Sequence, residues 1–258
     1  MNADGLRKLL ANPFVGFAPW IAMAVLAGPD RLVLAAAVAL GLALLSLGLG
    51  LAVHMSPKIL DVAGIAFFGV LVVISIVASD ATREWLEFYA GDLSNAVIFA
   101  IALLSIVIRQ PFTIQYARES TPREYWHSPL FLHINYVLTW AWVAAFAVMA
   151  ISGYIADGPL DDPDNLWLNW VVPIGALVLA IRFTDWYPDV AAGRAGAPGE
   201  HRSMPTIRDL LLPLSGFLVP VGIVVLIVGG TPWWLGVGLI VVGSLVSKAL
   251  HDGAQAAQ

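Results

Sequence analysis

The residue types that carry out most enzyme chemistry are few in this chain and follow no catalytic spacing. The 258 residues include no cysteine, which excludes disulfides, thiolate metal sites and covalent haem attachment. The histidines are scattered, without the HExxH or any other ligand spacing: His54, His127, His133, His201 and His251. No Ser-His-Asp arrangement or phosphate-binding loop occurs on the polar connections. We therefore expect no catalytic residues, no bound metal and no cofactor.

Most polar and aromatic residues that could form a contact site lie in residues 109–142. Residues 109–111 end one apolar segment, and Pro111 prevents its helix from continuing. Thr121-Pro122-Arg123-Glu124 combines a capping threonine, a proline at the first helical position and an acid at the third, which predicts a short helix from Pro122. Ser128-Pro129 then begins the next apolar helix. The candidate contact or cavity residues of the whole chain are Arg109, Gln110, Pro111, Trp126, Asn135, Trp140, Trp142, Trp167, Asn169 and Arg182.

Asn135 is the most informative of these candidates. At helical spacing it shares one face with Thr139 and Trp142, while His133, Tyr136 and Trp140 share another. A polar side chain inside an apolar helix is a functional-site hypothesis. The alternative, which we favour, is a hydrogen bond that holds two helices together.

Composition defines the class of protein that must position these residues. Hydrophobic residues make up 59% of the chain and charged residues 12%, and the mean hydropathy is +0.83. An ordinary globular domain has about 25% charged residues. The sequence therefore predicts an all-α integral membrane protein. The N-terminal apolar run could also be a cleaved signal peptide, but it leads directly into further apolar segments, which favours a retained helix.

About eight transmembrane helices are expected, and they form a single membrane domain over 1–258. The predicted spans are 14–28, 31–54, 60–79, 93–108, 129–154, 166–183, 210–230 and 232–247. The first segment is short, so the alternative is a re-entrant first segment followed by seven spans. Residues 80–92 are expected to form a separate amphipathic helix at the membrane surface, and residues 184–207 a polar loop. Ala37, Gly41 and Gly48 suggest a face of small residues for close helix packing.

The distribution of lysine and arginine predicts the orientation. Placing the N-terminus in the cytoplasm puts eleven of these residues inside and two, Arg31 and Arg83, outside. The inside set is Arg7, Lys8, Lys58, Arg109, Arg118, Arg123, Arg182, Arg194, Arg202, Arg208 and Lys248. The seven-span alternative gives nine inside and four outside. Both versions keep residues 109–128 and 184–207 cytoplasmic.

Several short motifs resemble the intracellular septation protein A family of bacterial inner membranes. The similar features are RQPFTIQ at 109–115, Trp126, Leu132 and Asn135 ahead of a tryptophan-rich helix, Asn165-Leu-Trp167-Leu-Asn169, and the start at Phe14, Phe17 and Pro19. The resemblance covers residues 13–188, which would form a core of six helices. Residues 205–250 would add a transmembrane hairpin. The resemblance implies a protein of cell-envelope maintenance and septation without catalysis.

Two functions from different classes remain open at this point. The first is a non-enzymatic, multi-pass protein of the bacterial inner membrane that acts through contacts with membrane lipids or with other envelope or division proteins. The alternative is a small-molecule or lipid transporter with a polar cavity, whose lining would include Asn95, Asn135, Thr139, Asn169 and Arg182. A membrane enzyme has the least support. No nucleic-acid partner is expected, and a homo-oligomer remains open.

Overall fold

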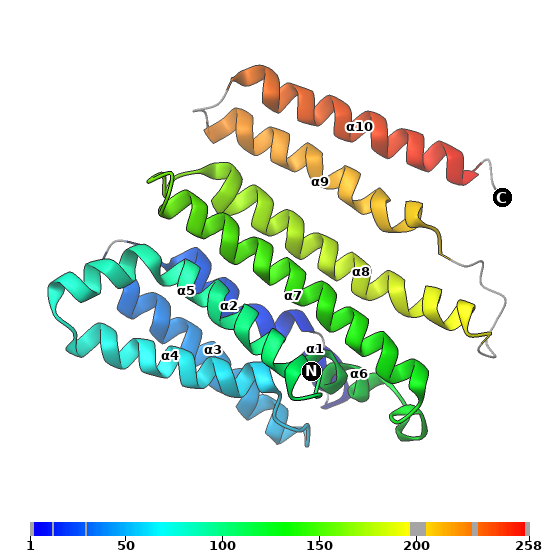
Figure 1. Ribbon diagram of the computed structural model, residues 1–258, viewed down its shortest axis with the longest axis horizontal. Helices are drawn as coiled ribbons and strands as arrows, with labels where there is room; N and C mark the ends of the chain where they lie inside the picture. The colour runs from blue at the N-terminus through cyan, green and yellow to red at the C-terminus, as the bar shows by residue number, and fades with distance from the viewer. Residues whose placement is uncertain (1–2, 12, 29, 197–204, 229–231, 256–258) are drawn as a thin grey trace. The chain divides into compact units, whose positions relative to one another are not determined.

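The computed structural model describes residues 3–11, 13–28, 30–196, 205–228 and 232–255, and within these ranges the chain forms helices and turns without a strand (Figure 1). The helices are α1 (Ala3–Ala11), α2 (Pro13–Leu26), α3 (Leu32–Ala52), α4 (Ile59–Val77), α5 (Asp80–Val107), α6 (Phe112–Ser120), the 3-10 turn η1 (Arg123–Tyr125), α7 (Pro129–Asp157), the π-helix η2 (Trp167–Val171), α8 (Val172–Arg194), α9 (Ile207–Val228) and α10 (Trp233–Gln255). Their architecture is all-α, as predicted.

Six helical segments in the described residues are long and apolar enough to cross a membrane. They are Leu32–Ala52, Ile59–Val77, Asp80–Val107, Pro129–Asp157, Trp167–Arg194 and Ile207–Ile227. Helices satisfy their own backbone hydrogen bonds, as a lipid environment requires, so the chain is a multi-pass membrane protein. Two shorter apolar segments, Val15–Leu26 and Trp233–Ala249, correspond to the first and last of the predicted spans. The 14 residues of α2 extend about 21 Å, less than the roughly 30 Å of a hydrocarbon core.

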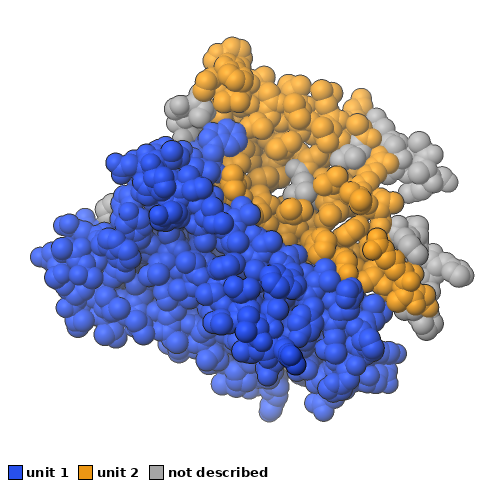
Figure 2. All heavy atoms as spheres, viewed as in Figure 1, with its two compact units in different colours: residues 1–169 blue, residues 170–258 orange. Residues whose placement is uncertain are grey.

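The contacts group the chain into two compact units, Met1–Asn169 and Trp170–Gln258, which Figure 2 colours separately. In the first unit, α5 packs along α7 and α3 packs along α4 (Figure 1). The short helix α2 contacts α3, α4 and α5, and its side chains Phe17, Trp20 and Met23 are buried. The core of this unit therefore forms around α2.

Small side chains bring α3 close to its neighbouring helices, but these side chains are not the ones that the sequence predicts. Ala35, Ala36, Ala39 and Ala43 are completely buried. The predicted face of Ala37, Gly41 and Gly48 is exposed instead, and a Cβ added at either glycine would meet nothing within 4 Å. Both sets have helical spacing, so the sequence pattern alone does not decide which face packs.

The second unit contains a tightly packed hairpin of α9 and α10. A Cβ added to Gly222 would lie 2.6 Å from the carbonyl oxygen of Gly236, and one added to Gly243 would lie 2.9 Å from Cβ of Leu218. Such approaches are open only to glycine, and they allow the two backbones to pack closely in lipid. Thr206 begins this hairpin as predicted, because its backbone N–H donates to Oδ2 of Asp209 at 2.6 Å.

Three predicted element boundaries are wrong. Residues 80–92 are the first turns of α5 and not a separate surface helix, since nothing in that stretch breaks a helix. The helix predicted from Pro122 is only the turn η1, and the α-helix of this connection, α6, precedes it. Residues 184–194 continue α8 instead of forming a loop. The Gly-Ala-Pro centre predicted for that loop extends into 197–204, outside the described residues.

Candidate functional site

The end of unit 1 at which α1 and α6 lie is closed by the connection between α5 and α7. After α5, Arg109 adopts a left-handed backbone conformation (φ 59°), and the N–H of Gln110 donates to the carbonyl of Ser105 at 2.8 Å. The hydroxyl of Ser105 accepts from the N–H of Phe112 at 3.1 Å. Pro111, between them, is fully buried. These contacts turn the chain back so that α6 lies against the bundle.

Asn135 and Thr139 hold α6 on α7. The hydroxyl of Thr113 on α6 donates to the backbone carbonyl of Asn135 at 2.9 Å and lies 2.8 Å from the hydroxyl of Thr139. The Asn135 side chain donates to the carbonyl of Phe131 at 2.8 Å. All three residues are buried, but Asn135 joins the two helices through its backbone carbonyl. Its side-chain amide bonds only within α7, and its Oδ1 has no hydrogen-bond partner among the described residues.

One turn further along α7, Trp142 belongs to a buried aromatic cluster. Its ring centroid lies 4.7 Å from that of Phe17 on α2 and 5.5 Å from that of Phe146. Phe17 also makes an edge contact with Phe112 of α6, at 6.4 Å. The cluster therefore joins α2, α6 and α7. Trp140, which the sequence places on a different face of the helix, is 53% exposed.

Two charged residues are buried where α3 leads into α4. Lys58 is 5% exposed and Asp61 is 7% exposed. The Lys58 ammonium donates to the carbonyl of Leu10 in the last turn of α1, at 2.5 Å, and lies 4.5 Å from the centre of the Tyr116 ring. The Asp61 carboxylate accepts from the hydroxyl of Ser46 at 3.1 Å. A buried charge is stable only with such partners.

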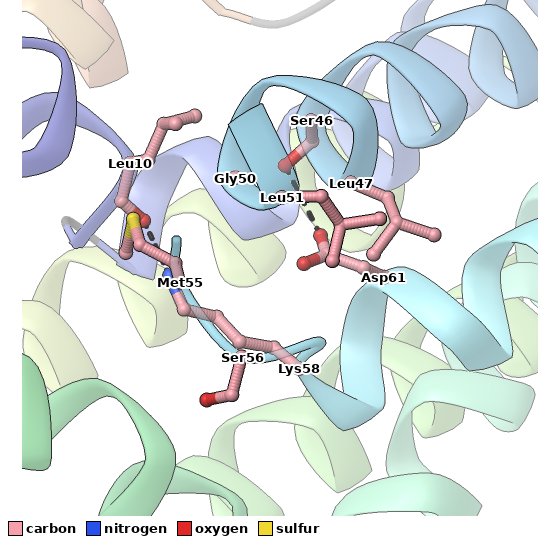
Figure 3. Close-up of a pocket in the computed structure, with 9 residues that line it drawn as sticks. All are labelled: Leu10, Ser46, Leu47, Gly50, Leu51, Met55, Ser56, Lys58 and Asp61. Carbon is pink, nitrogen blue, oxygen red and sulfur yellow. Dashed lines mark hydrogen bonds between the residues drawn. The ribbon is translucent and has the colours of Figure 1, made fainter. Parts of the chain in front are cut away.

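Figure 3 shows the pocket that these groups surround, with the Lys58–Leu10 and Ser46–Asp61 hydrogen bonds dashed. Its volume is about 10 Å³, which is close to the room that a single water molecule needs, and it is partly open to solvent. The lining residues are Leu10, Ser46, Leu47, Gly50, Leu51, Met55, Ser56, Lys58 and Asp61. Burial lowers the pKa of Lys58 from its ordinary value, and the charges of Asp61 and Glu119 partly oppose that shift.

Tyr116, whose ring contacts the Lys58 ammonium, is 5% exposed. Its hydroxyl points at the backbone of Gly16, where any Cβ would collide with it, and has no hydrogen-bond partner among the described residues. Burial raises the pKa of the Tyr116 hydroxyl, and the charge of Asp61 raises it further. Gln115, one residue earlier, accepts from the N–H of Ile59 at 2.7 Å and so joins α6 to the start of α4.

The exposed side of the same connection is basic and aromatic. The guanidinium carbon of Arg118 lies 5.0 Å from the centre of the Trp126 ring, and that of Arg123 lies 5.6 Å from it. The Trp126 ring N–H donates to the carbonyl of Thr121 at 2.8 Å, which fixes the ring. We call Arg118, Arg123 and Trp126 the arginine–tryptophan cluster.

Asn169 lies at the opposite end of unit 1. Its side-chain amide donates to Oδ1 of Asp157 at 2.8 Å and to the carbonyl of Pro163 at 2.9 Å. The Asp157 carboxyl lies near that of Asp92 on α5, whose Oδ2 is buried without a hydrogen-bond partner among the described residues. Gly153 leaves the room for this contact, because a Cβ there would collide with Asp92.

The structure thus brings together only some of the predicted residues. Pro111, Trp126, Asn135 and Trp142 belong to one end of unit 1 and Asn169 to the other, while the half-buried Trp167 begins η2. Arg109 and Gln110 are exposed beside the first group, and Arg182 is exposed on α8 in the second unit. In the described residues, no group of three or more His, Cys, Asp or Glu side chains could hold a metal ion.

The sequence does not single out Lys58, Asp61 or Tyr116 as candidate site residues, and Lys58 enters only the count of positive charges. The available signal was the position of Asp61 within the predicted span, because an ionisable residue inside a span is a functional-site hypothesis. Comparison with protein-family models, curated proteins and solved structures gives no significant match to this chain.

Proposed function

We propose that this chain is a non-enzymatic, multi-pass protein of the bacterial inner membrane that acts through contacts with membrane lipids or with other envelope proteins. The observation that carries the proposal is the ordered connection between α5 and α7. Its apolar side chains Phe112, Ile114 and Tyr116 are buried against the bundle, while Arg118, Arg123 and Tyr125 remain exposed. A polar surface held rigidly at the end of a bundle is suited to binding a partner.

A role in envelope maintenance or septation is the further step that the resemblance to intracellular septation protein A supports. In this proposal the chain has eight spans, with both termini and the α6 connection in the cytoplasm, as the lysine and arginine distribution favours. The orientation has a direct test because the chain lacks cysteine. A single cysteine at exposed Ser56 should resist a membrane-impermeant maleimide applied to spheroplasts, and one at exposed Ser79 should react. The reverse labelling pattern would contradict the orientation.

The contact function is tested by placing a photoreactive phenylalanine analogue at Tyr125. The matched control is the same analogue at Leu160, since both side chains are 54% exposed and lie at opposite ends of unit 1. We expect irradiation of native membranes to give discrete adducts with a protein or a lipid from position 125 and not from position 160. Equal or absent adducts at the two positions would contradict the proposal.

Transport is the second candidate, and the observation that favours it is the buried pair Lys58 and Asp61 beside a pocket (Figure 3). Ionisable residues within membrane proteins commonly mark ion or substrate pathways. If the chain transports a solute or protons, the purified protein in vesicles should dissipate an imposed pH gradient or accumulate a solute. Asp61→Asn should abolish the flux. If vesicles that contain the protein are no more permeable than protein-free vesicles under every gradient, this function is excluded.

A further inference from the structure

The arginine–tryptophan cluster holds two positive charges over one aromatic ring. Arg118 lies in the last turn of α6 and Arg123 begins η1, so the two arginines approach Trp126 from either side of the turn at Thr121. Cation–π contacts orient both guanidinium groups on the indole. Because the ring is fixed by its hydrogen bond to Thr121, both guanidinium groups are held in place by the fold.

The hydrogen-bonding capacity of these arginines is unused. Within the part of the chain that the structure describes, neither guanidinium group donates a hydrogen bond or joins an ion pair. Glu119 and Glu124 are adjacent in sequence but do not pair with them. A guanidinium group has five N–H donors in a planar fork that matches the oxygens of a phosphate or carboxylate. Two such forks side by side favour an anion with several acceptor oxygens.

The position of the cluster indicates where that anion comes from. The connection lies between Val107, which ends one span, and Pro129, which begins another. It is therefore at the level of the lipid headgroups, where aromatic and basic side chains collect. The abundant anions at that level are the phosphate groups of acidic phospholipids.

We propose that Arg118, Arg123 and Trp126 bind the phosphate group of an anionic phospholipid at the membrane surface. This inference rests on the proposed contact function, since it names the lipid that one part of the α5–α7 connection would bind. Each arginine donates to phosphate oxygens, and the indole keeps the two guanidinium groups from separating. The sequence explains the same arginines by topology alone, but topology requires only their charge and not their stacking on one ring.

The test uses the full-length protein in neutral detergent, titrated with phosphatidylglycerol and followed by native mass spectrometry. We expect Arg118→Gln/Arg123→Gln to weaken binding about 30-fold, from about five-fold for each arginine. The matched control is Arg31→Gln/Arg194→Gln, which removes the same charge from exposed arginines outside the α5–α7 connection. It should change binding less than three-fold. Equal weakening by the two double variants would overturn the proposal, because it would show a response to net charge alone.

Trp126→Leu tests the contribution of the ring independently of the charges, because it leaves both arginines in the chain. It should weaken phosphatidylglycerol binding about three-fold through loss of the cation–π contacts. Phosphatidylcholine, whose phosphate charge is balanced by the choline cation, should bind far more weakly and should not respond to these variants. Displacement of the lipid by millimolar inorganic phosphate would identify a free-anion site and overturn the lipid proposal, as would tighter binding of an acidic peptide.

Failure of this inference is distinguishable from failure of the proposed function. If the arginine variants bind lipid normally while the photoreactive probe at Tyr125 still captures a protein, the contact function stands and the lipid site is wrong. If the probe at Tyr125 captures nothing beyond the Leu160 control, the contact function itself is wrong.

Discussion

The ammonium group of Lys58 donates a hydrogen bond to the backbone carbonyl of Leu10, and so a buried charge holds the end of α1 on the bundle. Carbonyl groups in the last turn of a helix have no partner within the helix and carry its negative dipole end. Lys58 satisfies one of them. The contact joins residues 48 positions apart and gives this buried lysine a hydrogen-bond acceptor.

The first prediction concerns this lysine. Lys58→Met should destabilise the protein by about 2 kcal/mol, because the Leu10 carbonyl would lose its charged donor and the buried Asp61 would lose a nearby positive charge. Lys58→Met/Asp61→Asn should recover part of that loss. Unfolding in mixed micelles of increasing dodecyl sulfate measures the change, with Lys248→Met as the exposed control. Strictly additive effects of the two substitutions would show that Lys58 and Asp61 are not coupled.

The second prediction concerns Tyr116. Tyr116→Phe should leave stability unchanged or raise it by about 1 kcal/mol at neutral pH, because it removes a buried hydroxyl without a hydrogen-bond partner. The raised pKa of Tyr116 means that above about pH 10 the unfolded chain loses this proton first. The wild type should therefore lose stability as pH rises above 10, and the variant should lose less.

Unfolding curves between pH 7 and pH 11 measure this difference. Tyr125→Phe removes an exposed hydroxyl from the same connection and is the control, for which we expect the wild-type curve. A Tyr116→Phe protein that is clearly less stable than the wild type at neutral pH would mean that the hydroxyl has a partner, such as an ordered water molecule.

The third prediction concerns the α9–α10 hairpin. Gly222→Leu or Gly236→Leu should destabilise unit 2 by about 3 kcal/mol or more, because a side chain at either position meets the facing backbone. Gly216→Leu on α9 and Gly238→Leu on α10 are matched controls, since a Cβ at either would meet nothing within 4 Å. Thermal unfolding followed by circular dichroism compares the four variants. Equal effects at all four positions would contradict the packing described.

The fourth prediction concerns the contact between α5 and α7 at the opposite end of unit 1. Gly153→Ala should destabilise the protein by about 2 kcal/mol, because the added methyl group collides with Asp92. Gly91→Ala on α5 faces open space and should be neutral. Asp92→Ala should partly rescue Gly153→Ala in the same unfolding assay. If the rescue fails, the collision with Asp92 is not the cause.

Local signals in the sequence predict the parts of the fold that local forces determine. Apolar composition gave the helical membrane class, and Ser128-Pro129 gave the start of α7, where the Ser128 hydroxyl accepts from the N–H of Phe131 at 3.2 Å. The sequence predicts the lengths of the helices less well. Residues 80–92 and 184–194 are polar, but neither stretch stops the adjoining helix, and tertiary contacts let it continue past the apolar part.

The candidate site depends on contacts between residues far apart in the chain. Lys58 is buried only because α1 and Tyr116 cover it, and neither is near it in sequence. Asn135 was recognisable as a polar residue in a span, but its partner Thr113 could not be inferred, because a hydroxyl at that position is equally compatible with solvent. Periodicity identifies a face of a helix and does not identify its neighbour.

The anchoring of α6 has a consequence for biogenesis. Thr113 bonds to residues of α7, which the ribosome makes only after α6. Phe112, Ile114 and Tyr116 therefore lack their final cover while α7 is being inserted, and this end of the bundle closes late in synthesis. A nascent chain arrested when α6 has left the ribosome but α7 is still inside the exit tunnel should leave α6 open to protease, whereas a chain arrested after all of α7 has emerged should protect it.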